Sequence, residues 1–241
     1  MNQTGPAIKR FYKSVSVEKE GRSWTILLDE KSVRTPARSI LRLPTEGLAK
    51  LLADEWEAQR DVIHPQNMPM TRLANVAHDH MGTAKAASAG ELVRFAASDL
   101  LCFRVAEPLD LQELQAQKWD KWLDWTADIF GARLGVTTNL RTPSMPLAAL
   151  ENMRNTALEM HAFTLTPLVH VSAMLASAVL GFALVKGELD ADEAFVLSRI
   201  EEDWQIGQWG EDEEAKIRAD ALLVSLRASV AFMRAAPVAC S

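Results

Sequence analysis

Hydrophobic and polar residues alternate with a period of two in the first 44 residues of the chain. The apolar positions of this alternation are Phe11, Val15, Val17, Trp24, Ile26 and Leu28, with Val33, Leu41 and Leu43 continuing it. Polar residues, among them Tyr12, Ser14 and Ser16, fill the positions between them. Because successive strand side chains point to opposite faces, this pattern predicts a small antiparallel sheet with one apolar face. Short strands are not stable alone, so we expect the sheet to pack on the following helices or on a partner.

From Pro44 onward, apolar residues recur every three to four positions, as they do on one face of an α-helix. Thr45 is a suitable N-cap for the first helix. Further periodic stretches predict helices around residues 73–77, 92–103, 111–129, 147–160, 167–185, 190–209 and 211–235. The two periods together predict an α+β fold, in which a small antiparallel β part precedes a larger, mostly helical part.

The stretch 167–185 is almost wholly apolar, and His170 is its one ionisable residue. Its length just reaches the roughly 20 residues that cross a membrane. Serines, a glycine and many alanines make it a weak span, and no second span accompanies it. We therefore expect a buried central helix rather than a transmembrane segment.

A dense run of carboxylates that includes two tryptophans lies between Glu188 and Glu214. This segment holds eleven acidic residues against one basic residue, so its net charge is about −10, whereas the whole chain carries −6. Polarised negative charge with aromatic side chains is typical of a surface that docks a basic protein, rather than nucleic acid or anionic lipid. The candidate contact residues are Glu201, Glu202, Asp203, Trp204, Trp209 and Glu211. Carboxylates from Glu211 onward also suit a helix N-terminus, which is a structural explanation for part of the run.

Composition and the beginning of the chain indicate a cytoplasmic globular protein. Its 241 residues, 48% hydrophobic and 24% charged, suffice for one large domain or two small ones. Two cysteines, Cys102 and Cys240, give no disulfide framework and fit a reducing compartment. Residues 1–9 have neither the apolar run of a signal peptide nor the Arg-rich pattern of a transit peptide.

The sequence contains no recognisable catalytic motif. Its glycines do not have the spacing of a phosphate-binding loop, there is no nucleophile elbow, and no cysteine or histidine pair has zinc spacing. Alternate residues of a helix point apart, so the run His78-Asp79-His80 is not expected to bind metal. We therefore expect no metal, no cofactor and no small-molecule substrate. Trp119, Trp122 and Trp125 share one side of a predicted helix and are expected to be a packed core stripe rather than an exposed aromatic platform.

Eight short motifs, spread from residue 10 to residue 210, together carry a resemblance to a known family. They are Arg10-Phe11-Tyr12-Lys13; Arg34-Thr35-Pro36; Leu43-Pro44; Glu55-Trp56 with Gln59; Met68-Pro69-Met70-Thr71 with Leu73-Ala74-Asn75; Asp99-Leu100-Leu101-Cys102-Phe103-Arg104; Gln117 with Trp119-Asp120; and Glu201-Glu202-Asp203-Trp204-Gln205 with Trp209-Gly210. Each is weak alone, but eight in one order make a specific signal. On these residues the chain resembles the ATP12-type assembly chaperones of F-type ATP synthase, as a bacterial member.

The resemblance implies a two-domain chaperone without catalytic activity. A β-rich domain would span residues 1–44 and an α-helical domain residues 45–241. The protein would bind the unassembled alpha subunit of the catalytic sector and protect its beta-facing surface until the alpha/beta hexamer forms. Functional positions of the family fall on Glu201 and Trp56, and Glu55 and Asp99 lie in motifs that carry the resemblance.

The position of Glu201 has its own physical meaning. On one helix beginning near Asp190, Leu197 precedes it by four residues and Trp204 follows it by three, so its carboxylate is predicted on or beside the apolar stripe. An unpaired charge there is unfavourable. It would pair either with a partner's arginine, which the resemblance favours, or within the chain with Arg199, Arg218 or Arg104. Trp56 is expected mainly to pack the domain, so that its loss would unfold the protein.

Two other functions remain open from the sequence alone. One is a scaffold or adaptor for a different basic protein. The other is a metal-free hydrolase or lyase that uses a carboxylate pair such as Glu202 and Glu213 in a cleft. A deep pocket in which carboxylates with raised pKa values converge would favour the enzyme.

Overall fold

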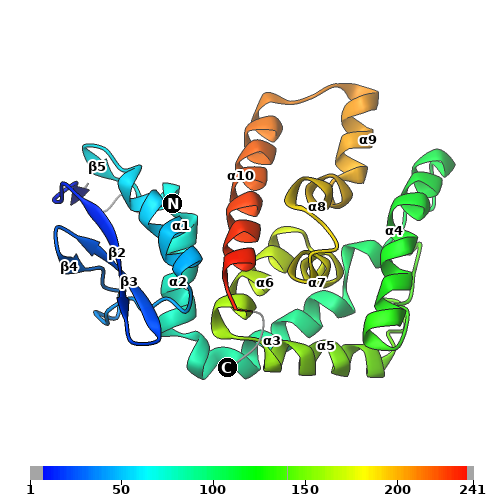
Figure 1. Ribbon diagram of the computed structural model, residues 1–241. Helices are drawn as coiled ribbons and strands as arrows, with labels where there is room; N and C mark the ends of the chain where they lie inside the picture. Colours follow the sequence, from blue (N-terminus) through cyan, green and yellow to red (C-terminus); the bar gives the residue numbers. More distant parts are fainter. Residues whose placement is uncertain (1–7, 140, 238–241) are drawn as a thin grey trace.

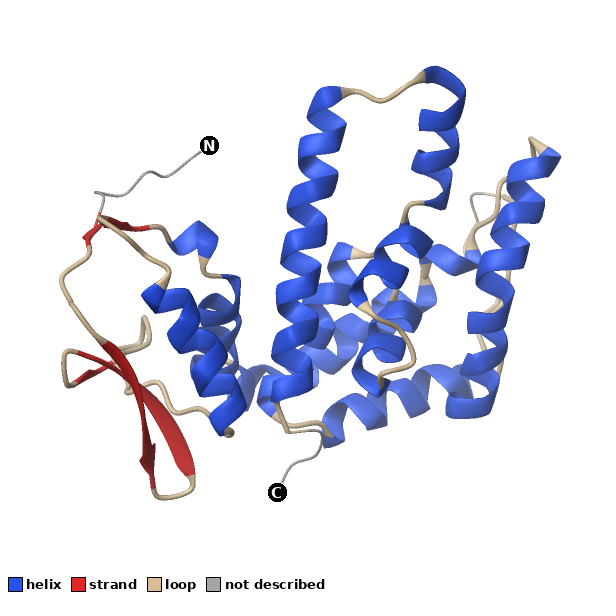
Figure 2. Ribbon diagram, turned by 45° about the horizontal axis from the view of Figure 1, so that its top comes forward, coloured by secondary structure: helices blue, strands red, loops and turns tan. Residues whose placement is uncertain are grey.

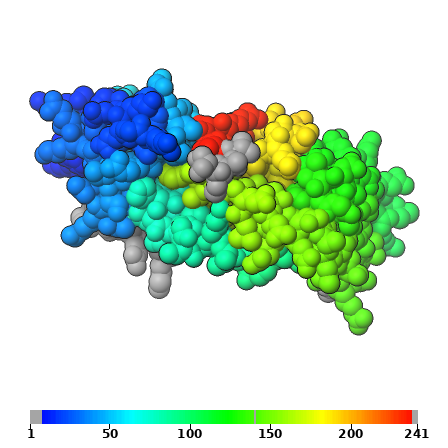
Figure 3. Space-filling model, turned by 60° about the horizontal axis from the view of Figure 1, so that its bottom comes forward, coloured from blue at the N-terminus to red at the C-terminus, as the bar shows by residue number. Residues whose placement is uncertain are grey.

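The computed structural model describes residues 8–139 and 141–237, and Cys240 lies outside them. A lobe of short strands and two helices stands at one end of the molecule, and a larger helical lobe makes up the rest (Figure 1). The predicted α+β fold is confirmed. In the space-filling view, α4 (Leu109–Phe130) lies at the end opposite the strands, with the end of α10 (Glu213–Ala235) between the two lobes (Figure 3).

The strands form two small antiparallel sheets. One has the order β2-β3-β4, and the other pairs β1 with β5. Their bounds are β1 Ile8–Lys9, β2 Val15–Glu20, β3 Ser23–Leu28, β4 Lys31–Ser32 and β5 Val62–Ile63. Ile26 and Leu28 are buried on the apolar face, as their alternation predicts.

The turn from β3 to β4 contains no glycine. Asp29 and Glu30 adopt φ values of 46° and 69°, the left-handed region that a two-residue hairpin loop requires. The Asp29 carboxylate accepts hydrogen bonds from the backbone N–H groups of Lys13 and Ser14, 3.0 and 2.9 Å away. These bonds hold the pKa of Asp29 below its usual value.

The alternation predicts that Phe11 is on the apolar face and that Tyr12 is on the polar face. This prediction is wrong, because the structure exposes Phe11 and buries Tyr12. Phe11 is 66% exposed, whereas Tyr12 is 4% exposed. Both precede β2, so the alternation of the strand does not extend to them. Tyr12 turns inward because Trp56, on the helix α1 (Glu46–Glu57), offers its ring an aromatic partner and its hydroxyl a carbonyl acceptor.

Helices α1 (Glu46–Glu57) and α2 (Pro69–Asp79) complete the first lobe. Thr45 caps α1 as predicted, its hydroxyl accepting from the N–H of Leu48. The buried cluster of this lobe combines strand residues with residues of both helices and extends to the helical lobe through Phe163 and Phe232, whose rings stack 6.2 Å apart. A division into domains at residue 44 stays a prediction.

The other helices surround a second, larger buried cluster. Figure 2 shows α9 and α10 side by side at the top of this lobe, joined by a short loop. The bounds are η1 Pro65–Asn67, α3 Met81–Ala97, η2 Leu100–Cys102, α4 Leu109–Phe130, α5 Leu147–Glu159, α6 Ala162–Met174, α7 Ala178–Lys186, α8 Ala191–Ser198, α9 Ile200–Trp209 and α10 Glu213–Ala235.

The apolar stretch 167–185 is buried, but it is not one helix as predicted. It contains most of α6 and α7, which are separated at Ala176, where φ is 49°. Ser177 begins the second helix by accepting from the N–H of Leu180. Among the helices of the described residues, none has the length and hydropathy needed to cross a membrane.

The tryptophans of α4 form the predicted core stripe. Trp119 and Trp122 are 1% and 8% exposed, and Trp125 is partly buried against them. The indole N–H of Trp119 donates to the carbonyl oxygen of Leu197, 2.8 Å away. This bond ties α4 to the end of α8, immediately before the acidic helix.

Candidate functional site

The acidic segment is broken at Arg199, so the single predicted helix from Asp190 onward is wrong. A capping box between Asp190 and Glu193 begins α8. Arg199 has non-helical backbone angles (φ −118°, ψ 15°) and separates α8 from α9. Its guanidinium lies over the ring of Phe195, 5.4 Å from the centroid, and its Nε is 3.5 Å from a carboxylate oxygen of Asp203. These contacts to both sides stabilise the bend.

Helix α9 has one buried edge and one exposed end. Ile200 is 6% exposed and belongs to the large core. Trp204 is half-buried, and its indole nitrogen is 3.4 Å from a carboxylate oxygen of Asp110 on α4. Trp209, at the end of the helix, is 77% exposed, and its ring meets that of Trp204 edge to face. The two indoles thus form an aromatic edge next to the carboxylates.

Glu201 is exposed, and among the described residues its carboxylate pairs with none of the three arginines considered as internal partners. Each of the three candidate arginines pairs elsewhere: Arg199 with Asp203, Arg218 with Asp212 and Glu214, and Arg104 with Asp120. Within residues 8–139 and 141–237, neither Glu201 nor Glu202 forms an ion pair. Both carboxylates are therefore free to meet a cation of another molecule.

The remaining predicted carboxylates, Asp203 and Glu211, are exposed, and each lies beside a cation of the chain. Asp203 lies beside Arg199, and a Glu211 carboxylate oxygen is 3.6 Å from Lys216 Nζ. Asp212 caps α10 by accepting from the N–H of Ala215, 3.1 Å away. The acidic run at the start of α10 thus has the structural role that its position indicated.

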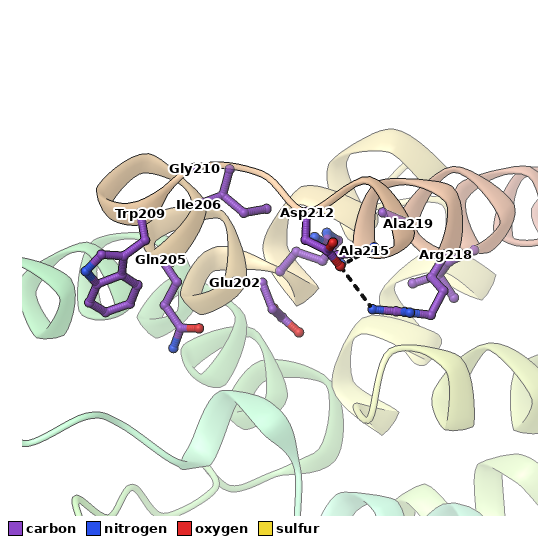
Figure 4. A pocket seen from close by; sticks show the side chains of 11 residues that line it. Glu202, Gln205, Ile206, Trp209, Gly210, Asp212, Ala215, Arg218 and Ala219 are labelled. Atoms are coloured by element: carbon purple, nitrogen blue, oxygen red, sulfur yellow. Dashed lines mark hydrogen bonds and ion pairs between the residues drawn. The ribbon is translucent and has the colours of Figure 1, made fainter.

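A hollow of about 440 Å³ lies between α9 and the first half of α10 (Figure 4). Figure 4 shows Glu202, Gln205 and Arg218 pointing to the same side of this helix pair, with Trp209 at the far end of α9. Apolar side chains from both helices line it further, namely Ile206, Ala215, Ala219 and Leu222.

Sequence reasoning missed this hollow. Ala215, Ala219 and Leu222 belong to the apolar stripe of α10, which periodicity assigns to the core. The part of the stripe in the C-terminal half of α10, including Leu226 and Val230, is buried in the core. The part in the N-terminal half is only half-buried, because the hollow lies between it and α9. Helical period identifies an apolar face but not what covers it.

The hollow does not resemble a carboxylate-pair active site. Glu202 lines it, but Glu213 does not. The carboxyl groups with raised pKa values, Glu55 and Asp99, lie elsewhere in the fold. No deep pocket with converging carboxylates occurs at this surface, so nothing in the described residues favours the hydrolase. That part of the chain also has no cluster of three or more His, Cys, Asp or Glu residues placed to hold a metal ion.

Glu55 holds the N-terminus of α2. Its carboxylate accepts from the backbone N–H groups of Met70 and Thr71 and from the Thr71 hydroxyl, each at 2.8 Å. Burial nevertheless raises the pKa of Glu55. The neighbouring Trp56 packs its half-buried ring against Tyr12. Both residues therefore join parts of the β lobe, and neither lies on the acidic surface.

Asp99 is completely buried and joins two distant parts of the chain. Its carboxylate accepts from the N–H of Leu101, from the Ser177 hydroxyl at 2.8 Å and from the N–H of Val179 at 2.9 Å. It thereby caps η2 and α7 together, at the break after α6. Burial raises the pKa of Asp99 to about 6. Its geometry indicates a structural role.

Comparisons with known proteins agree with one another. A family model described as ATP12 chaperone protein matches residues 9–127. The chain is 25% identical over 224 residues to the mitochondrial protein atp12 of Schizosaccharomyces pombe. This alignment covers 87% of this chain and 76% of the relative. The crystal structure of Atp12 from Paracoccus denitrificans superposes with a TM-score of 0.88 at 38% identity, over 95% of this chain and 99% of that one. A solved chain from Agrobacterium tumefaciens has a TM-score of 0.91 at 38% identity, over 95% and 87% of the two chains.

Proposed function

This chain belongs to the ATP12 chaperone family, which serves the assembly of F1-ATPase, and we propose that it binds the unassembled alpha subunit of that complex. The proposed contact surface is the exposed acidic face of α9 and the start of α10, comprising Glu201, Glu202, Asp203, Trp204, Trp209 and Glu211. While bound, it protects the surface of alpha that the beta subunit later occupies.

The observation that carries the proposal is the accessibility of free carboxylates next to an exposed indole. Glu201 and Glu202 lack an intramolecular cation within the described residues, and Trp209 is 77% exposed. Exposed aromatic groups beside unpaired charges suit an interface with a cationic, partly apolar partner surface. Exposed apolar surface rimmed by polar residues is typical of the interaction sites of unassembled subunits.

Such binding suppresses wrong association of alpha by mass action. A partner that covers an exposed assembly surface lowers the concentration of free surface available for aggregation. Beta competes for the same surface, so the growing hexamer displaces the chaperone. The acidic surface speeds encounter with a basic client, and this attraction weakens with salt, because the Debye length is only about 8 Å at physiological ionic strength. The cytoplasmic location remains a prediction.

The test is capture of the alpha subunit encoded in the same genome. Tagged wild-type protein is expected to retain alpha from a lysate, whereas Glu201→Lys loses it while keeping the circular dichroism spectrum of the wild type. Glu151→Lys is the matched control, since Glu151 is exposed on α5 and carries the same charge change away from the proposed surface.

Unchanged capture by folded Glu201→Lys would remove Glu201 from the interface. If wild-type protein retains a different basic protein and no alpha subunit, the adaptor replaces the alpha-subunit chaperone as the function of this surface.

A further inference from the structure

The hollow between α9 and α10 differs from the rest of the acidic surface because it combines a free carboxylate with an apolar wall. Ala219 and Leu222 of α10 and Ile206 of α9 form this apolar part of the lining. Its volume of about 440 Å³ lies within the roughly 300–1,000 Å³ typical of small-ligand pockets. This space accommodates whole side chains of a partner, not only contacts at the rim.

The charged side chains that line the hollow differ in whether they already have an ion-pair partner. Arg199 lies beside Asp203, and Arg218 lies between Asp212 and Glu214. Glu202, by contrast, forms no ion pair within the described part of the chain. Among the described residues, both cations of the lining already lie beside carboxylates, whereas the Glu202 carboxylate has no cation partner. A cationic side chain is its electrostatic complement.

The neighbourhood of Glu202 favours arginine over lysine. The indole of Trp209 lines the same hollow and is largely exposed. A guanidinium group forms paired hydrogen bonds with a carboxylate and stacks on an aromatic face, whereas an ammonium group is a compact, strongly hydrated charge. The apolar wall suits the aliphatic stem of the same side chain.

We propose that this hollow receives an arginine side chain of the client, with its stem against Ala219 and Leu222 and its guanidinium between Glu202 and Trp209. The proposal rests on the proposed function, since the client is the alpha subunit. It adds a specific anchoring point to an otherwise general electrostatic surface, and such buried anchors carry most of the affinity of an interface.

The test compares the affinity of purified, unassembled alpha subunit for full-length variants. Glu202→Gln preserves shape and removes the charge, and we expect it to weaken binding at least tenfold. Ala219→Phe fills the hollow and is expected to abolish capture. Ala148→Phe is the matched control, because Ala148 is exposed on α5, outside the proposed contact surface, and does not line the hollow; its affinity should stay within twofold of wild type.

A double-variant measurement separates one shared arginine from general charge attraction. If the same side chain contacts both residues, the combined loss in Glu202→Gln with Trp209→Leu is smaller than the product of the single losses. If the wild-type protein binds alpha and both Glu202→Gln and Ala219→Phe bind it with unchanged affinity, the proposed arginine site is wrong. The proposed function is not affected by that result. Failure of wild-type protein to bind alpha at all overturns both.

Discussion

The hydroxyl of Tyr12 donates a hydrogen bond of 2.6 Å to the backbone carbonyl oxygen of Trp56, and the two rings meet edge to face with centroids 5.9 Å apart. Arg10 reinforces this contact, because its guanidinium lies over the Tyr12 ring and donates to the carbonyl oxygens of Glu57 and Gln59 at the end of α1. The segment before β2 is thereby fixed to α1.

Replacing Trp56 by alanine should destabilise the protein by about 3 kcal/mol, because removal of a packed indole loses its transfer free energy and leaves a cavity. Tyr12→Phe, which keeps the ring and removes only the hydroxyl, should cost about 1 kcal/mol. Urea unfolding followed by circular dichroism measures both values. Equal stability of Trp56→Ala and wild type would show that this residue does not hold the lobe together.

The burial of Asp99 should make stability depend on pH. Its pKa is raised from 3.8 to about 6, so the folded protein holds the proton more tightly than the unfolded chain does. This contribution is complete below about pH 4 and is lost as the pH rises to about 6. The stability of wild type relative to Asp99→Asn should therefore fall by about 3 kcal/mol over that interval. Parallel curves of unfolding free energy against pH for the two proteins would contradict this.

Replacement by glycine should change the melting temperature in opposite directions at the two residues of the β3–β4 turn. Glu30 has a φ of 69°, which costs a side-chain-bearing residue about 1 kcal/mol, so Glu30→Gly should raise the melting temperature slightly. Asp29→Gly removes the acceptor for the N–H groups of Lys13 and Ser14 and should lower it. Thermal unfolding compares them; a lower melting temperature for Glu30→Gly would show that the turn carries no strain there.

The exposure of Trp209 should be visible without any partner. Trp209→Leu is expected to leave the unfolding free energy within about 0.5 kcal/mol of wild type. It should also remove the fluorescence component most accessible to acrylamide, because the indole is 77% exposed. Trp119→Leu, at a position 1% exposed, should instead destabilise the fold. A quenching curve that Trp209→Leu does not change would mean that the indole is covered in solution.

The sequence was sufficient for the fold class because two periods, of two and of about 3.6 residues, are local properties of the chain. The same reasoning failed where a distant contact decides the local conformation. Tyr12 is buried because of Trp56, which lies 44 residues away. The break at Ala176 has no glycine or proline to mark it, and the capping carboxylate there comes from Asp99. Only Ser177, a good N-cap, was a local signal of the second helix.

For the candidate site, the sequence indicated which residues are charged and aromatic but not which charges are free. Arg199 pairs with Asp203 at the i,i+4 spacing of a helix, which the sequence contains, whereas the contact of Arg218 with Asp212 depends on how the chain enters α10. The pairing leaves Glu201 and Glu202 available, a distinction that composition does not contain. The hollow depends on the separation of two helices and has no signature in either one.

The most direct test of the account is hydrogen–deuterium exchange of the full-length protein with and without the unassembled alpha subunit, read by mass spectrometry. The proposed surface requires slower exchange in α9 and the first half of α10, residues 200–222, when alpha is bound, and little change in α5. Stable binding of alpha with unchanged exchange in α9 and α10, and protection on another face instead, would contradict the central claim.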